Sequence, residues 1–143
     1  METCRLGNSD LHITRLGIGA WAIGGSGWNG SMGPHNEDDS VPAIHAALDH
    51  GLNWIDTAVL YGLGHSEDVI ARALRGRSQR PYIFTKCERV WDSRGTIGAC
   101  LKAAAIRKEC EDSLRRLHSG DRRELDWGKR CYSTFQKSIT GTN

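Results

Sequence analysis

Three short strand-like runs, each separated from the next by a helix-like segment, constrain the fold more than any other feature of this chain. The runs occupy residues 16–21, 53–56 and 81–86, and the last of them is aromatic and β-branched without polar alternation. Continuously apolar strands between amphipathic helices are typical of parallel sheets covered on both faces. The pattern therefore predicts an α/β protein with a parallel sheet.

The segments between these runs have the spacing of amphipathic helices. The first helix should begin at residues 38–40 and end before Gly51, with Pro42 tolerated in its first turn. The second should begin at residues 66–67 and stop at Gly76. A third helix should run to about residue 117, with apolar residues in register on one face: Ile106, Cys110, Leu114 and Leu117.

A small hairpin is predicted before the first strand, over residues 4–13, because turn residues separate two short apolar ends. The βα rhythm stops after Leu117, and no four consecutive apolar residues occur in residues 118–143. We therefore expect a folded region, residues 1–117, followed by a divergent, poorly ordered tail, residues 118–143. Three parallel strands leave open sheet edges, through which self-association is expected.

Composition excludes several classes of protein. The formal net charge is +2, which argues against nucleic-acid binding through a basic face. No stretch approaches the roughly 20 apolar residues that span a bilayer, so no membrane partner is expected. The five cysteines form no C-x-x-C pair, so no metal site is predicted, and scattered free thiols favour a cytoplasmic protein.

Three chemically active side chains follow the predicted strands. Asp56 ends the second strand, Tyr61 lies in the glycine-rich loop behind it, and Lys86 ends the third strand. The carboxyl ends of parallel strands open on one face, so these residues should converge there. A phenol, with a reference pKa of about 10, donates protons poorly unless a neighbouring ammonium assists it. Tyr61 is thus a candidate general acid, with Lys86 its modulator and Asp56 the anchor of the lysine; a structural ion pair beside a loop tyrosine is the alternative.

These residues also carry a resemblance. Asp-Thr-Ala at residues 56–58, Tyr61-Gly62, Ser66-Glu67 and Phe-Thr-Lys at residues 84–86 occur in this order, and residues 6–11 read Leu-Gly-Asn-Ser-Asp-Leu. The strand at residues 16–21 and the helix at residues 107–117 fit the same pattern. In these motifs the chain resembles the aldo-keto reductase family, and bacterial-type members in particular.

The resemblance implies a (β/α)8 barrel, of which residues 4–117 would form the N-terminal hairpin and about three βα units. It implies carbonyl reduction with NADPH, or the reverse alcohol oxidation, on a small carbonyl or sugar-like substrate. Tyr61 would protonate the developing alkoxide, and Lys86 and Asp56 would tune it. The cofactor would lie against Ala20 and Trp21, and Asp56 would approach its nicotinamide ribose.

The sequence also departs from the family pattern. The family's fourth catalytic residue is a histidine at the end of an apolar fourth strand, and no such strand follows Leu117. We therefore expect a truncated reductase without activity of its own. Two alternatives stay open: a non-enzymatic interaction or regulatory module, and a half-barrel that rebuilds the site by homodimerisation.

Two further patterns occur between residues 17 and 30. Residues 17–22 satisfy G-x-G-x-x-A, but the Rossmann fingerprint needs a helix there, and the glycine-rich residues 23–30 cannot continue one. Trp21 and Trp28 lie in the loop on the expected active face. Lining a pocket and simple packing are both open interpretations for them.

Overall fold

The computed structural model describes residues 1–34 and 36–117 of the 143-residue chain. Its elements follow in the order β1 (Thr3–Arg5), β2 (His12–Thr14), β3 (Ile18–Gly19), η1 (Ala22–Gly24), α1 (Glu37–Asp49), β4 (Trp54–Asp56), α2 (His65–Leu74), β5 (Tyr82–Phe84), β6 (Arg89–Trp91), β7 (Ile97–Ala99) and α3 (Ala103–Leu117). The tail predicted for residues 118–143 lies outside the described residues. Within those ranges, no helix combines the length and apolar character that crossing a bilayer requires.

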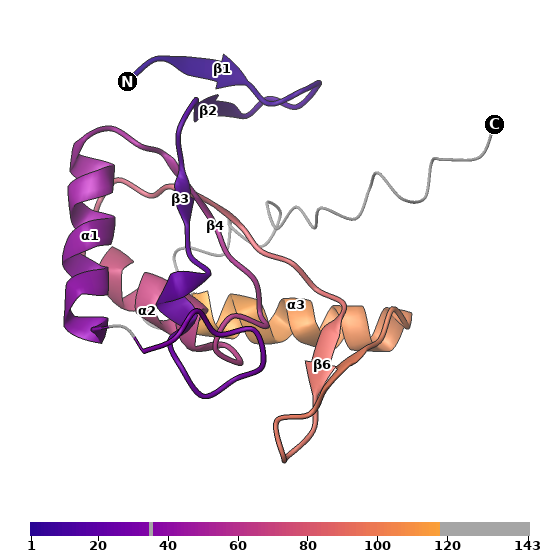
Figure 1. The fold of residues 1–143 in the computed structure, drawn as a ribbon. Coiled ribbons are helices and arrows are strands. Elements are labelled where there is room, and N and C mark those ends of the chain that lie inside the picture. The colour runs from indigo at the N-terminus through magenta and orange to yellow at the C-terminus, as the bar shows by residue number, and fades with distance from the viewer. Residues whose placement is uncertain (35, 118–143) are drawn as a thin grey trace.

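The centre of the molecule is a parallel sheet with the order β3–β4–β5 (Figure 1). Ile55 of β4 lies opposite Ile18 of β3 and Ile83 of β5, and its side chain is fully buried. This register stacks one apolar layer across all three strands. The predicted parallel sheet with three βα units is confirmed, and among the described residues it does not close into a barrel.

The predicted hairpin is also confirmed. Strands β1 and β2 pair antiparallel, and Figure 1 shows them at the end of the molecule where the parallel strands begin. Asn53, just before β4, fixes this hairpin to the sheet. Its side chain accepts from the Thr14 N–H at 2.8 Å and donates to the His12 carbonyl at 2.9 Å. The hairpin therefore covers the amino-terminal ends of the strands and leaves the opposite ends accessible.

Helix α1 begins earlier than the sequence predicted. The Asn36 side chain accepts from the Asp38 N–H at 3.2 Å and caps the helix, and three acidic residues of the first turn suit its positive end. Pro42 consequently lies inside the helix and not in its first turn, so that prediction was wrong. The helix ends as expected near Gly51, whose φ is +87°.

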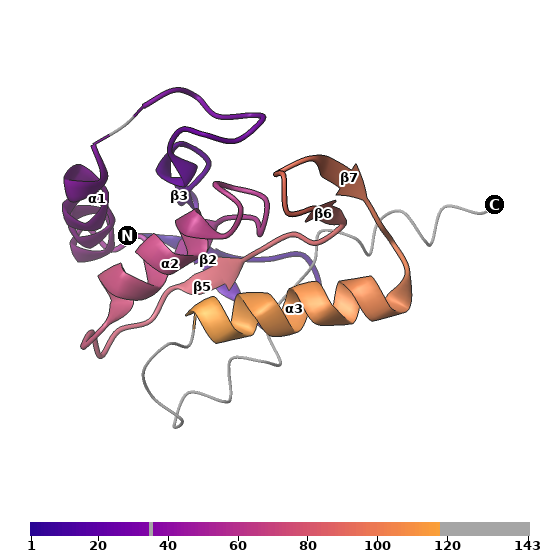
Figure 2. The same cartoon turned by 90° about the horizontal axis from the view of Figure 1, so that it is seen from below.

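Helix α2 is the most deeply buried helix described and lies between the other two. It contacts both α1 and α3, and Figure 2 shows α3 running alongside it. It begins at His65, one residue before the predicted start, and its predicted apolar face is buried in the core. That core consists of residues from the sheet, α1 and α2: Ala20, Ile44, Leu48, Ile55, Val69, Ile70, Ala73, Leu74 and Ile83.

The first parallel strand is shorter than predicted. Only Ile18 and Gly19 pair with β4, and Leu16 is 64% exposed. Trp21 already has helical backbone angles (φ −61°, ψ −49°) and leads into the 3-10 turn η1. The expected buried strand over residues 16–21 is therefore reduced to its middle, because the helical backbone at Trp21 ends the extended conformation.

The predicted third helix is confirmed as α3, but its deepest burial is not at the apolar residues that define its period. Its most buried residues are polar, Glu109 and Ser113, whereas the predicted apolar residues of this helix are only half-buried. The apolar period correctly predicted a helix. Leu117, one of these apolar residues, packs against the hydrophobic core.

Gly17, just before β3, lies beneath the indole ring of Trp54 in β4. A Cβ atom on Gly17 would lie 2.1 Å from Cε2 of Trp54, so the indole ring occupies the space of the missing side chain. The Trp54 Nε1–H donates to the Thr14 carbonyl at 2.8 Å, which holds the ring in place.

Gly17→Ala is therefore expected to lower the free energy of unfolding by about 1–3 kcal/mol, the usual cost of overpacking. Urea denaturation followed by tryptophan fluorescence measures the change. Gly19→Ala is the matched control, since a Cβ there meets nothing within 4 Å. Equal stability of the two variants would contradict this account of the Gly17 contact.

Candidate active site

The carboxyl ends of β4 and β5 bring Asp56 and Lys86 together. Asp56 is the last residue of β4 and lies opposite Phe84, so Lys86 leaves β5 beside it. The Lys86 ammonium donates to Asp56 Oδ1 and, at 3.1 Å, to the Thr57 carbonyl. Both side chains are about one-third to two-fifths exposed, at 35% and 40%. The ion pair is thus formed at the open edge of the sheet.

Tyr61 reaches the same lysine from the loop after β4. Lys86 Nζ lies 3.5 Å from the Tyr61 hydroxyl oxygen and 5.3 Å from the centre of its ring. Asp56, Tyr61 and Lys86, which the sequence placed on one face, therefore form one chain of polar contacts. Their catalytic roles stay a prediction.

Two glycines allow the loop of Tyr61 to lie against the chain after β3. A Cβ on Gly24 would lie 2.7 Å from the Gly62 nitrogen, and a Cβ on Gly62 would lie 2.2 Å from the Gly24 oxygen. Gly62 also has a φ of +65°, which favours glycine. This close contact between two backbones fixes the position from which the Tyr61 side chain reaches Lys86.

Two tryptophans from the glycine-rich loop surround the phenol. Trp21 stacks on Tyr61 with ring centres 6.0 Å apart and planes 11° apart, and Trp28 lies 6.2 Å from it at 37°. Each indole N–H donates to a loop carbonyl, at 2.7 Å for Trp21 and 3.0 Å for Trp28. Trp21 nevertheless remains 49% exposed. The aromatic rings thus form an apolar wall with an accessible face.

Ala20, predicted to contact a cofactor, is fully buried. Its N–H donates to the Asp56 carbonyl at 2.9 Å, and its carbonyl accepts from the Ser66 hydroxyl at 2.9 Å. The structure therefore gives Ala20 a role in joining β3 to β4 and α2. Its contact with a cofactor stays a prediction, as do those of Trp21 and Asp56.

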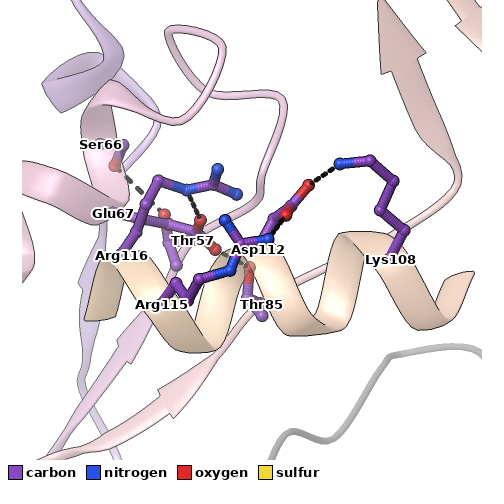
Figure 3. A network of polar contacts seen from close by, with 8 residues as sticks. All are labelled: Thr57, Ser66, Glu67, Thr85, Lys108, Asp112, Arg115 and Arg116. Carbon is purple, nitrogen blue, oxygen red and sulfur yellow. Dashed lines mark hydrogen bonds and ion pairs between the residues drawn. The ribbon is translucent and has the colours of Figure 1, made fainter. Parts of the chain in front are cut away.

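A buried polar network lies behind the site (Figure 3). Glu67 of α2 is fully buried, accepts from the Thr85 hydroxyl at 2.8 Å and accepts from Arg116 Nε at 2.7 Å. Beside it, the Thr57 and Ser66 hydroxyls lie 3.2 Å apart. Thr57 directly follows Asp56, and Thr85 directly precedes Lys86. The network therefore holds the chain next to both members of the ion pair.

A second hairpin borders the site and was not predicted. Strands β6 and β7 pair antiparallel, and Figure 2 shows them beyond the carboxyl end of β5. The Asp92 side chain accepts from the N–H groups of Arg94 and Thr96, each at 2.9 Å, and Gly95 has a φ of +77°. The sequence signal for this turn is the Asp-Ser-Arg-Gly run between Val90-Trp91 and Thr96-Ile97.

The environment of Cys87, beside Lys86, suppresses thiol ionisation. Burial raises the pKa of Cys87, and the nearby Glu109 carboxylate raises it further. Burial likewise raises the pKa of Glu109 itself.

Within the described residues, no group of three His, Cys, Asp or Glu side chains is arranged to hold a metal ion.

Comparisons with known proteins bear directly on this geometry. The model of the Aldo/keto reductase family matches residues 15–125. The chain belongs to this family. The aldo-keto reductase YhdN of Bacillus subtilis is 34% identical over 121 residues, which cover 83% of this chain and 35% of that protein. The NADH-specific methylglyoxal reductase of Escherichia coli is 34% identical over 128 residues, covering 82% of this chain and 38% of that protein.

Solved structures of aldo-keto reductases share the fold. Glycerol dehydrogenase AKR11B4 of Gluconobacter oxydans aligns with a TM-score of 0.69 and 41% identity, covering 82% of this chain and 36% of that one. An aldo-keto reductase of Klebsiella pneumoniae in complex with NADPH aligns with a TM-score of 0.58 and 32% identity, covering 82% and 35%. This chain thus spans little more than a third of the length of these relatives.

Cys87 is expected to react with iodoacetamide more slowly than the exposed Cys4 at neutral pH, because only the thiolate attacks and its raised pKa keeps Cys87 protonated. Mass spectrometry of the alkylated chain gives both rates. Glu109→Gln should speed the reaction of Cys87 by removing the neighbouring charge. Equal rates for the two cysteines in the folded protein would show that the environment of Cys87 is not as described.

Proposed function

We propose that this aldo-keto reductase chain carries the proton-donating half of an NADPH-dependent carbonyl reductase site. The observation that supports it best is the single ammonium group of Lys86, which contacts Asp56, the Thr57 carbonyl and the Tyr61 hydroxyl together. A cation held in this way beside a phenol favours release of the phenolic proton. The same edge of the sheet carries the aromatic wall against which a flat ring could lie.

In this proposal the Tyr61 hydroxyl donates its proton to the oxygen of a small carbonyl or sugar-like substrate. Lys86 stabilises the phenolate that remains, and Asp56 orients the lysine. The reverse direction, alcohol oxidation, uses the same groups with Tyr61 accepting the proton. Trp28 and Trp21 exclude water from one side of the phenol.

The residues present fit the nicotinamide end of the cofactor. Trp21 offers a half-exposed indole beside Tyr61, and the Asp56 carboxylate is 40% exposed at the same edge. Trp21, Asp56 and the backbone near Ala20 would hold this end, and the cofactor would supply the hydride. The Klebsiella pneumoniae structure in complex with NADPH supports the choice of NADPH, whereas the Escherichia coli relative is named for NADH.

We further propose that residues 1–143 by themselves do not turn over substrate. The resemblance assigns a fourth catalytic residue, a histidine, to a fourth strand, and residues 1–34 and 36–117 supply only three parallel strands.

The free thiols of Cys4, Cys87, Cys100 and Cys110 support a cytoplasmic location.

A hybrid enzyme tests the proposed site. Residues 15–117 would replace the matching segment of the Gluconobacter oxydans glycerol dehydrogenase, which is 41% identical. We expect the hybrid to oxidise glycerol, and Tyr61→Phe and Lys86→Met each to lower kcat by about 10²–10⁴-fold. The 143-residue chain alone should give no turnover. Activity of the hybrid that survives Tyr61→Phe would contradict the assigned role of the tyrosine.

A second candidate function is an interaction module that associates with another copy of itself. Among the described residues, β3 and β5 each pair only with β4, so both edges of the sheet are open. Beside β3 lies an open groove of about 390 Å³, whose apolar lining comes from both the strand region and α1 and includes Ile18, Ile23, Ala43, Ile44 and Ala47. A second copy could cover this groove and extend the sheet.

Self-association predicts that the molar mass in solution rises with concentration in multi-angle light scattering. Ala43→Arg should reduce this rise, because Ala43 is exposed and lines the groove. Ala46→Arg is the matched control, since Ala46 is an exposed alanine of the same helix outside the groove lining. A monomer at all concentrations, or equal effects of both substitutions, would exclude association through this groove.

A further inference from the structure

The chain has an unusual backbone conformation two residues after Lys86. Glu88 has a φ of +110°, outside the regions that residues with a side chain readily adopt. Such a conformation is strained and persists only where the surrounding structure holds it. Glu88 lies between Lys86 and hairpin β6–β7, and contacts with other elements hold it in this conformation.

Two hydrogen bonds fix Glu88 from different elements. Its N–H donates to Oε2 of Glu109 on α3 at 3.0 Å. Its carbonyl accepts from the N–H of Cys100, just after β7, at 2.8 Å. The carboxylate thus attaches the segment that follows Lys86 to a helix.

A buried glutamate at position 109 is energetically unfavourable unless its carboxylate makes that contact. It is 7% exposed, and among the described residues its Oε1 atom has no hydrogen-bond partner. Burying a carboxylate without full hydrogen bonding is unfavourable, and burial raises the pKa of Glu109 accordingly. An apolar side chain would fill the same volume at lower cost, but it could not accept the Glu88 N–H.

The residue on the other side of Lys86 is held in a similar way. Thr85 donates to the buried Glu67 at 2.8 Å, and Arg116 of α3 neutralises that carboxylate (Figure 3). Lys86 therefore lies between two backbone positions that are each fixed by a buried carboxylate. Helix α3 contributes to both, through Arg116 and through Glu109.

We propose that Glu109 is a positioning residue for Lys86, acting through the backbone of Glu88. By accepting the Glu88 N–H it holds the strained turn, and the turn sets the direction in which the lysine leaves β5 toward Asp56 and Tyr61. The proposal rests on the proposed function for the importance of Lys86. The position of the lysine is measurable in the 143-residue chain without turnover.

The test compares Glu109→Ala and Glu109→Met with Glu109→Gln, whose amide oxygen can still accept the Glu88 N–H. Glu111→Gln is the matched control, because Glu111 is an exposed glutamate on the same helix. Hydrogen exchange by NMR reports the Glu88 amide, and limited acetylation with mass spectrometry reports Lys86 relative to the exposed Lys102. A lysine that leaves its contacts with Asp56 and Thr57 should react faster.

We expect Glu109→Ala and Glu109→Met to speed exchange at the Glu88 amide by roughly tenfold, as loss of one hydrogen bond to a charged group implies. Acetylation of Lys86 should rise severalfold in the same variants. Glu109→Gln and Glu111→Gln should keep both rates near those of the parent chain. The methionine variant preserves side-chain volume, so it serves if the alanine variant unfolds.

Unchanged acetylation of Lys86 in the folded methionine or alanine variant would overturn the proposal, even if the Glu88 amide exchanges faster. So would a glutamine variant that behaves like the methionine variant. Failure of the proposed function has a different signature. A hybrid enzyme indifferent to Lys86→Met would remove the catalytic role of the lysine and leave both rates as expected.

Discussion

The rest of the structure depends on one buried carboxylate, Glu67. It lies in the first turn of α2 with no exposed surface, and its two oxygens accept from Thr85 next to β5 and from Arg116 on α3. A charge in this position is tolerated only while its partners remain, and loss of one partner of a buried pair costs about 3–5 kcal/mol. Glu67 thereby ties two helices and the end of a strand to one geometry, and Lys86 directly follows Thr85.

The site follows from this arrangement together with the direction of the strands. Parallel strands present Asp56 and Lys86 at the same edge, and the contact between Gly24 and Gly62 brings the loop of Tyr61 down to meet them. The aromatic wall depends on the same contact, because Trp21 directly precedes the turn that contains Gly24. The close contact between the backbones at Gly24 and Gly62 therefore positions both the polar and the aromatic parts of the site.

Helix α3 shows that an apolar period can predict a helix without identifying the polar residues that hold it in place. Glu109, Ser113 and Arg116 face inward, whereas the apolar residues of the period are half-buried. Asp112 forms ion pairs with Lys108 and Arg115, whose side chains are largely exposed, so these pairs contribute little to stability. The polar inward side instead connects to the backbone on both sides of Lys86.

The sequence by itself determined the sheet, the helices and the family, because strand pattern, glycine positions and the motif at residues 56–67 are local and ordered. It also placed Asp56, Tyr61 and Lys86 on one face, since parallel strands end at a common edge. Only the tertiary structure decided that Ala20 is buried, that Pro42 lies inside α1 and that Glu109 faces the segment after Lys86. These features depend on caps, turns and contacts between residues far apart in the chain, such as Glu88 with Glu109 and Thr85 with Glu67, and no short-range pattern encodes them.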